Sequence, residues 1–251
     1  TSVPGMTARA LEERGAIHIP ALFPLGVEGT EAWLRAAAQV FHVREQVFQD
    51  TIASAFARAE ASLRRSRERL AGRSLFFFPD SQLEIPLARY VSEELGMRLI
   101  EVGTPYLHRA HLSEDLAKLP SGTLISEGQD VERQLDRCRA EDPDLVVCGL
   151  GLANPLEAEG FTTKWSIELL FSPIQGFDQA GDLFGGQERV GRGVGREGWH
   201  GNGREKGEGK KLRAHGYPPV AGIVMRLTGR TANTARDRTI AGRTAVMFFW
   251  L

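Results

Sequence analysis

The spacing of apolar and polar positions changes once along the chain, near residue 73. Before that point apolar residues recur every three or four positions, as Trp33, Leu34, Ala37 and Phe41 do. This spacing predicts an amphipathic helix from about residue 30, and the same pattern predicts a longer helix over residues 43–70. The first 25 residues are rich in proline and glycine and carry one short predicted helix, over residues 7–14.

From residue 73 onward, short continuous apolar runs alternate with helical patterns. Strands are predicted over residues 74–78, 97–102, 122–126 and 145–148, and helices over 81–96, 111–119 and 130–140. Continuous apolar strands are typical of sheets covered on both faces, and strands separated by helices pair in parallel. The pattern therefore predicts an α/β fold with a Rossmann-like parallel sheet and flanking helices.

A further apolar run, over residues 165–171, is predicted to be a fifth strand. Trp165 and Phe171 are six positions apart, so in a strand they share a face. Core packing is one interpretation of these two aromatic side chains. The other is a flat apolar wall against a large aromatic ligand.

Polar or glycine- and proline-bearing segments follow each predicted strand, at residues 79–81, 103–106, 126–129, 149–160 and 172–174. Ligands of parallel sheets bind beyond the carboxyl ends of the strands. The segment 149–160 is predicted to be a long loop, because Gly149, Gly151 and Asn154-Pro155 interrupt the pattern. It fails the dinucleotide fingerprint, since Asn154 replaces the last glycine, and the chain has no Walker A motif.

Other candidate chemistry is weaker. The arginines over residues 64–69 are interleaved with acidic residues, which favours a solvated helix over nucleic-acid binding. His108 and His111 have no further metal ligands nearby in the sequence. Glu157 and Glu159 could act as an acid/base pair, although neighbouring loop carboxylates are more often simply solvated. Cys138 and Cys148 match no metal or redox spacing and are predicted to be buried, reduced thiols.

Charge divides the chain in two. Residues 183–251 carry 13 lysines and arginines against 5 acidic residues, whereas the chain as a whole has a formal net charge of −1. Ten glycines fall between residues 185 and 209, with few large apolar residues, so residues 183–251 are predicted to be a disordered Gly/Arg-rich tail. No apolar run of about 18 residues, the length that crosses a membrane, occurs.

Several motifs together resemble one family. The segments LANPLEAEG, TTKWSIEL and GFDQAGDL, with FFFPDSQLEIPLARY and VGTPYLHRAHL upstream, are similar to the C-terminal part of the N subunits of light-independent protochlorophyllide reductases, a nitrogenase-like family. The resemblance covers about residues 15–182. It implies a division into residues 1–72, a remnant of the family's middle domain with connecting helices, residues 73–182, the C-terminal Rossmann-like domain, and the atypical tail 183–251.

The resemblance also implies an activity. In the family, an N2B2 heterotetramer of subunits N and B receives electrons from an iron protein, the L-subunit dimer, which uses ATP-Mg. A 4Fe-4S cluster between N and B relays the electrons, and a ring double bond of protochlorophyllide is reduced in chlorophyll or bacteriochlorophyll biosynthesis. Aromatic residues in the matching strand region line the pigment pocket, which assigns Trp165 and Phe171 as substrate-binding residues. The location implied is the cytoplasm, or the chloroplast stroma for a plastid protein.

Two departures from the family modify these expectations. The cluster cysteines of the family precede the matching region, and neither Cys138 nor Cys148 matches one, so this chain is expected to hold no cluster and to be inactive alone. The chain starts with Thr1 and its first methionine is Met6, from which we expect a fragment of a longer protein. The foreign tail suggests the hypothesis of a frameshifted or read-through product.

Alternative functions remain open. A subunit of another nitrogenase-like reductase, such as a chlorophyllide reductase or a nitrogenase, would have the same scaffold. A non-catalytic α/β domain that docks a partner would also explain the polar strand ends, and an unrelated transferase is disfavoured by the missing phosphate loop.

Overall fold

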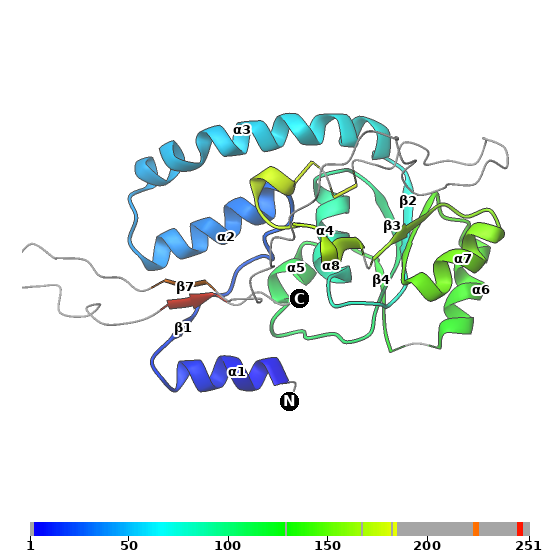
Figure 1. Cartoon of the computed structure of the whole chain (residues 1–251), viewed down its shortest axis with the longest axis horizontal. Helices are drawn as coiled ribbons and strands as arrows, with labels where there is room; N and C mark the ends of the chain where they lie inside the picture. The colour runs from blue at the N-terminus through cyan, green and yellow to red at the C-terminus, as the bar shows by residue number, and fades with distance from the viewer. Residues whose placement is uncertain are drawn as a thin grey trace, which may run out of the picture. The chain divides into compact units, whose positions relative to one another are not determined.

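The computed structural model describes residues 3–128, 130–166, 168–181, 183–184, 223–225 and 245–247, without the side chains of residues 3–5, 7, 8, 170, 171, 223–225 and 245–247. Contacts divide the chain into one unit of residues 1–17 and 192–248 and a larger unit of residues 18–191 and 249–251. The smaller unit contains α1 (Val3–Glu12) and the antiparallel strands β7 (Ile223–Met225) and β8 (Ala245–Met247). The chain passes from the smaller to the larger unit within the short strand β1 (Ile17–His18; Figure 1).

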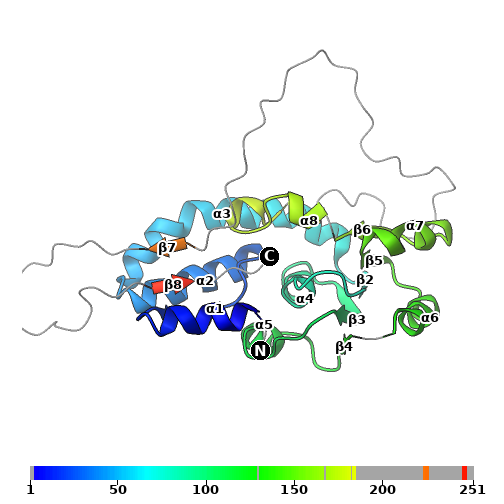
Figure 2. The same ribbon diagram turned by 60° about the horizontal axis from the view of Figure 1, so that its bottom comes forward.

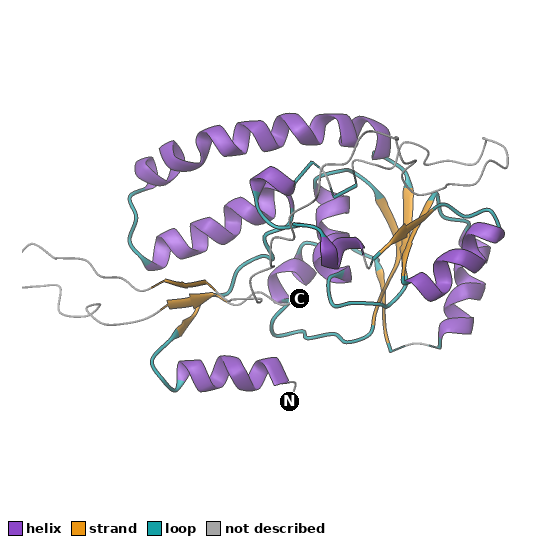
Figure 3. Ribbon diagram, in the orientation of Figure 1, coloured by secondary structure: helices purple, strands orange, loops and turns teal. Residues whose placement is uncertain are grey.

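The larger unit alternates strands and helices from residue 74 onward (Figure 3). Its elements are α2 (Gly26–Val40), α3 (Glu45–Leu70), β2 (Ser74–Phe77), α4 (Glu84–Glu93), β3 (Arg98–Thr104), α5 (Ser113–Ala117), β4 (Leu124–Glu127), α6 (Val131–Glu141), β5 (Leu145–Cys148), α7 (Leu150–Ala158), β6 (Thr163–Trp165), α8 (Glu168–Phe171) and the 3-10 turn η1 (Phe177–Gln179).

A five-stranded parallel sheet organises this unit. The strand order is β4-β3-β2-β5-β6, and every neighbouring pair runs in parallel. Strand β2 pairs with β5 in the register Leu75 to Leu145 and Phe77 to Val147. The Rossmann-like sheet predicted from the sequence is therefore confirmed, with β6 as a fifth strand.

Apolar side chains alternate between the two faces of the sheet and build a core on each. Phe76 and Phe78 face one side, where they pack with residues of α6 and α7 such as Leu135 and Leu156. Helices α6 and α7 lie together on one side of the sheet and α4 lies on the other (Figure 2). The continuous apolar strands of the sequence thus reflect burial on both faces.

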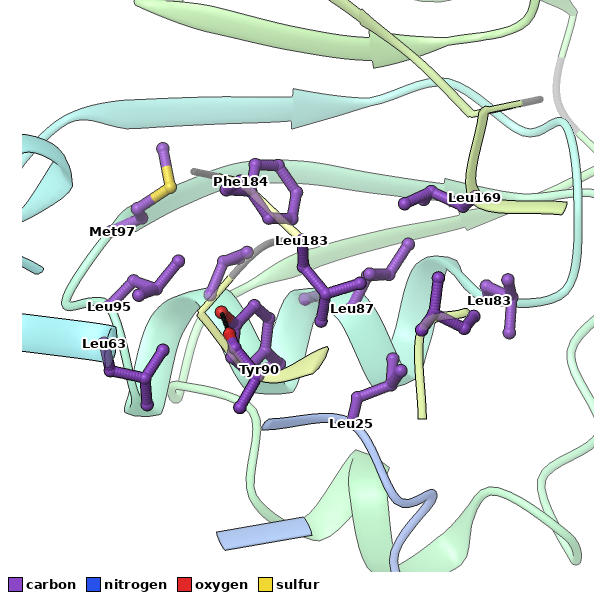
Figure 4. Packing of buried hydrophobic residues seen from close by; sticks show 14 of the residues in the cluster. Leu25, Leu63, Leu83, Leu87, Tyr90, Leu95, Met97, Leu169, Leu183 and Phe184 are labelled. Carbon is purple, nitrogen blue, oxygen red and sulfur yellow. Dashed lines mark hydrogen bonds between the residues drawn. The ribbon is translucent and has the colours of Figure 1, made fainter. Parts of the chain in front are cut away.

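The core on the second face is centred on α4. Figure 4 shows Tyr90 and Leu87 of this helix among leucines from other segments, with Leu183 and Phe184 close by. The rings of Tyr90 and Phe184 are 6.3 Å apart between centroids. The Tyr90 hydroxyl donates to the carbonyl of Ala180 at 2.6 Å, which ties the segment after η1 to α4.

A fully buried arginine joins α4 to the chain before α2. Arg89 donates through Nε to Asp115 Oδ1 at 2.8 Å and through Nη1 to Glu94 Oε1 at 3.2 Å. Its Nη2 donates to the carbonyls of Phe23 and Leu25, at 3.3 and 2.8 Å. Burial raises the pKa of both carboxyls, and the charge of Arg89 acts in the opposite direction. This Arg89 cluster fixes the start of the α2–α3 helical pair on the α/β layer.

Two sequence-based predictions about local structure are wrong. Residues 149–160 are not a long loop, because α7 begins directly after Gly149 and contains Pro155. Burial of Ala153 and Leu156 against the sheet outweighs the hydrogen bond that Pro155 cannot make. Residues 165–171 are not one strand either, since β6 ends at Trp165 and α8 holds Phe171.

Predictions about residues 183–251 fall mostly outside the described part of the chain. Leu183 and Phe184 are buried in the core, at 5% and 2% exposure, so apolar packing continues to residue 184. Residues 185–222, 226–244 and 248–251 lie outside the described residues, and with them the predicted disorder and the frameshift hypothesis. The division at residues 72 and 182 also remains a prediction.

Candidate functional site at the carboxyl edge of the sheet

The strand order creates one topological switch point, between β2 and β5. From β2 the chain adds β3 and β4 on one side, and it then crosses back to add β5 and β6 on the other. The segments that leave β2 and β5 consequently diverge at the carboxyl edge. This is the place where parallel α/β sheets bind ligands, so we take it as the candidate site.

A carboxylate lies at this switch point. Asp80 follows β2, and its carboxylate is so close to Gly149, the N-cap of α7, that a Cβ at position 149 would overlap it. The hydroxyl of Ser166, at the end of β6, donates a short hydrogen bond to Asp80 Oδ2. Three strand ends therefore meet at Asp80, and the N-terminus of α7 favours its negative charge.

A second carboxyl group, Glu84, is buried behind Asp80 at 2% exposure. Its Oε1 accepts from the backbone N–H groups of Asp80 and Ser81, at 3.1 and 2.5 Å, and its Oε2 accepts from Thr104 Oγ1 at 3.2 Å. Ser81 Oγ accepts from the N–H of Leu83, so Ser81 and Glu84 both bind backbone N–H groups of the turn that leads into α4. Burial raises the pKa of Glu84 to about 7.

The two predicted substrate-binding residues are placed differently. Trp165 ends β6 opposite Cys148 of β5, half-buried, and its indole N–H donates to Glu157 Oε1 at 3.2 Å. Phe171 is the last residue of α8, and its side chain lies outside the described part of the structure. They do not share a strand face, because the strand stops at Trp165 and a helical turn follows. Their role in substrate binding remains a prediction.

Glu157 and Glu159 serve separate partners. Glu157 accepts from Trp165 and, through a short hydrogen bond, from the Thr163 hydroxyl. Glu159 forms a bidentate ion pair with Arg139, with N–O distances of 2.8 Å, which lowers the pKa of Glu159. The two carboxylates therefore do not act on one atom, and Glu157 instead orients the indole of Trp165.

Exposed apolar side chains surround the switch point. Tyr106 follows β3, Val131 opens the helix after β4, and Leu150 opens the helix after β5, with exposures of 46%, 40% and 50%. We call Tyr106, Val131, Leu150 and Trp165 the apolar rim. Because each follows or ends a parallel strand, all four lie at the carboxyl edge of the sheet, where they suit an apolar ligand or a partner subunit.

The two cysteines lie inside the core beside β5. Cys138 of α6 and Cys148 of β5 are fully buried among apolar side chains, and burial raises the pKa of each thiol to about 12. Such thiols are protonated at neutral pH, whereas metal–sulfur clusters require thiolates. The predicted burial is confirmed, and these residues do not fit an iron–sulfur cluster. No group of three His, Cys, Asp or Glu side chains among the described residues has the arrangement of a metal site.

Sequence reasoning marked residues 79–81 as a strand end but missed the roles of Asp80, Glu84 and Ser166. The Ser-x-x-Glu spacing of Ser81 and Glu84 was the available signal that Glu84 binds the N–H of Ser81 before α4. Nothing local pairs Asp80 with Ser166, because 86 positions separate them. None of the helices that the structure describes is long and apolar enough to cross a membrane.

Comparison with known proteins gives concordant results. Residues 3–185 match the family model described as nitrogenase component 1 type oxidoreductase. Over 179 residues the chain is 69% identical to the light-independent protochlorophyllide reductase subunit N of Bradyrhizobium sp. (strain BTAi1 / ATCC BAA-1182), and 66% identical to the protein of that name from Rhodospirillum rubrum. These matches cover 71% of this chain and only 42% and 41% of the two relatives, so the chain spans less than half of their length.

Solved structures support the fold. Two structures titled nitrogenase Cp1, at pH 5 and pH 6.5, superpose with TM-scores of 0.53 and 0.54 at 15% and 14% sequence identity. They cover 63% and 62% of this chain and 39% and 41% of the nitrogenase chains.

Proposed function

The chain belongs to the nitrogenase component 1 type oxidoreductases, and we propose that it forms the C-terminal part of the N subunit of a light-independent protochlorophyllide reductase. The observation that carries this proposal is the 69% identity over 179 residues to a subunit of that name. The names of the relatives favour this reading over a chlorophyllide reductase or a nitrogenase.

The carboxyl edge of the sheet provides chemistry that suits the substrate. Protochlorophyllide is a flat, largely apolar macrocycle with a polar periphery, and aromatic side chains pack against such rings over a large area. Trp165 is held by the hydrogen bond from its indole N–H to Glu157, so one face of the indole can act as a fixed wall. Phe171 is proposed to contribute to the same pocket. The wall positions the ring double bond that is reduced.

The remaining parts of the reaction are assigned to partners. Nitrogenase-type proteins work as multisubunit complexes with metal–sulfur clusters. We propose that a B subunit completes the pigment pocket in an N2B2 assembly, and that an ATP-dependent L-subunit dimer delivers electrons through a 4Fe-4S cluster. The buried thiols of this chain do not supply cluster ligands, so we expect no iron–sulfur chromophore and no reductase activity from the chain alone. The assembly is proposed to work in the cytoplasm or in the chloroplast stroma.

Co-expression with cognate B subunit tests the proposal. The complex should retain protochlorophyllide absorbance after purification, and Trp165→Ala should remove most of it. Leu124→Ala is the matched control, because Leu124 is also exposed and apolar but opens β4 at the opposite edge of the sheet. Unchanged pigment retention in Trp165→Ala would refute the site. A chain that binds the B subunit without retaining any pigment would instead support a docking domain.

A further inference from the structure

The carboxylate of Asp80 occupies the place where an anionic ligand would bind in a doubly wound sheet. It lies against Gly149, which caps the nine-residue helix α7. The carboxylate oxygens of Asp80 fill the space that a side chain at position 149 would need. No lysine or arginine of the described residues forms a salt bridge with it. Asp80 is exposed to solvent, so its carboxylate needs no buried cation.

Ser166 is the side chain that binds Asp80. The Ser166 hydroxyl lies within hydrogen-bond distance of two acceptors, Asp80 Oδ2 and, at 3.1 Å, the carbonyl oxygen of Cys148. A hydroxyl has one hydrogen to donate, and the charged carboxylate is the stronger acceptor of the two. The backbone N–H of Ser166 donates to the carbonyl of Cys148 at 3.0 Å, so the residue continues the pairing of β6 with β5 by one position. At 5% exposure Ser166 is buried, and both its backbone and its side chain are held.

Trp165 directly precedes Ser166, and the indole end of its side chain is held by a separate contact. Its indole N–H is bound to Glu157 of α7, whereas its backbone continues into Ser166. Strand β6 has only three residues and ends here, so its ladder alone does not determine the chain direction after Trp165. The hydrogen bond between Asp80 and Ser166 supplies the missing constraint.

We propose that Asp80 is a positioning residue for Trp165, acting through the hydroxyl of Ser166. The inference deepens the proposed function and rests on it where pigment binding is concerned. The loop after β2 thereby sets the orientation of the aromatic wall at the end of β6. A change in the position of Asp80, for example by a ligand or subunit that contacts residues 79–81, would move Trp165.

Fluorine NMR of the 251-residue chain labelled with 5-fluorotryptophan tests the proposal directly. The resonance of Trp165 is assigned by its loss in Trp165→Phe. Asp80→Ala and Ser166→Ala should each shift or broaden this resonance by more than its wild-type linewidth, while the resonance of buried Trp33 stays in place. Asp80→Asn keeps an acceptor for Ser166 and should remain close to wild type. The double variant Asp80→Ala/Ser166→Ala should shift no further than the single ones, because both remove one hydrogen bond.

The controls separate this inference from the proposed function. Glu159→Gln removes a carboxylate of the same region that pairs with Arg139, and it should leave the Trp165 resonance unchanged. In the complex with B subunit, Asp80→Ala should weaken pigment retention by about tenfold. An unmoved Trp165 resonance in folded Asp80→Ala, or in Ser166→Ala if the former does not fold, would overturn the inference. If the Trp165 resonance moves but Trp165→Ala leaves pigment binding unchanged, only the proposed function is refuted.

Discussion

Carboxyl groups gather in two regions of the larger unit, and the regions differ in what surrounds these groups. In the Arg89 cluster, Glu94 and Asp115 share one fully buried guanidinium, which also binds two backbone carbonyls. At the carboxyl edge, Glu84 and Asp80 receive hydrogen bonds from N–H and O–H groups, and no cation among the described residues pairs with them. The first arrangement joins helices permanently. The second leaves carboxyl groups without a cation at the place where a parallel sheet binds ligands.

This comparison indicates how to separate structural from functional polar groups in such a fold. A buried ion pair with complete partners restricts the chain but offers nothing to a ligand. Glu84, whose hydrogen-bond donors are all neutral, remains sensitive to pH because burial raises its pKa. The region beside the apolar rim is therefore the better candidate for function, although the Arg89 cluster contains more charge.

The largest effect is expected from Arg89→Met. The substitution leaves Glu94 and Asp115 buried without their cation, which should lower the free energy of unfolding by about 3–5 kcal/mol. Urea denaturation followed by circular dichroism measures it. Arg139→Met, whose guanidinium pairs with Glu159 at the surface, should stay near the wild-type midpoint. Equal stability of wild type and Arg89→Met would show that the cluster is dispensable.

Glu84 should make stability depend on pH. Its pKa is about 7 in the folded protein against an ordinary value of 4.5, so the folded state binds this proton more tightly than the unfolded chain does. The resulting stabilisation is complete below the ordinary pKa and is lost as the pH rises through about 7. Relative to Glu84→Gln, the wild type should lose on the order of 3 kcal/mol across this interval.

Urea unfolding at a series of pH values measures this difference. Glu68→Gln, which changes an exposed carboxylate of α3, provides the control and should follow the wild type at each pH. If the free energy of unfolding changes with pH in parallel for the wild type and Glu84→Gln, the expectation is contradicted. The Arg89 cluster would then resemble the carboxyl edge more closely than the hydrogen bonds suggest.

Gly149→Ala tests the close approach of Asp80 to α7. The backbone at Gly149 has a φ of −71°, which any residue adopts, so the cost comes from overlap with the Asp80 carboxylate. We expect a loss of about 1–3 kcal/mol in the free energy of unfolding. The double variant Gly149→Ala/Asp80→Ala should recover part of this loss. Additive effects of the two substitutions would place the carboxylate elsewhere.

Tyr90→Phe should have the smallest effect, since it removes one neutral hydrogen bond within the core. The hydroxyl donates to Ala180 at 2.6 Å, and its loss should cost about 1 kcal/mol. The same denaturation assay measures it, with Phe184→Leu as a probe of the adjacent apolar packing. A loss as large as that of Arg89→Met would mean that the segment after η1, and not the ion pair, dominates the packing around α4.

Much of the α/β layer follows from local sequence. The strand over residues 145–148 was predicted with the observed bounds, because Asp142-Pro143 precedes a short apolar run and Gly149 ends it. The parallel pairing follows from the alternation of such runs with helices. The candidate edge follows as well, since strand ends at 79–81 and 149 carry polar or glycine residues.

Other features were decided by tertiary contacts. Asn154-Pro155 indicates a loop when read alone, yet the burial of Ala153 and Leu156 on the sheet makes this segment helical. Phe171 matches Trp165 in strand spacing, yet β6 ends at Trp165 and Phe171 lies in the helix α8. Local propensity is weak compared with burial, so segments with mixed signals take the conformation that the neighbouring layer requires.

Sequence alone thus determined the fold class, the order of strands and helices over residues 74–148, and the edge where function was to be sought. The pattern of apolar runs carries that information because each element must bury one face. Only the tertiary structure decided which polar groups meet at that edge. Asp80 and Ser166 are 86 positions apart, and their contact depends on the order of the strands in space, which no local pattern encodes.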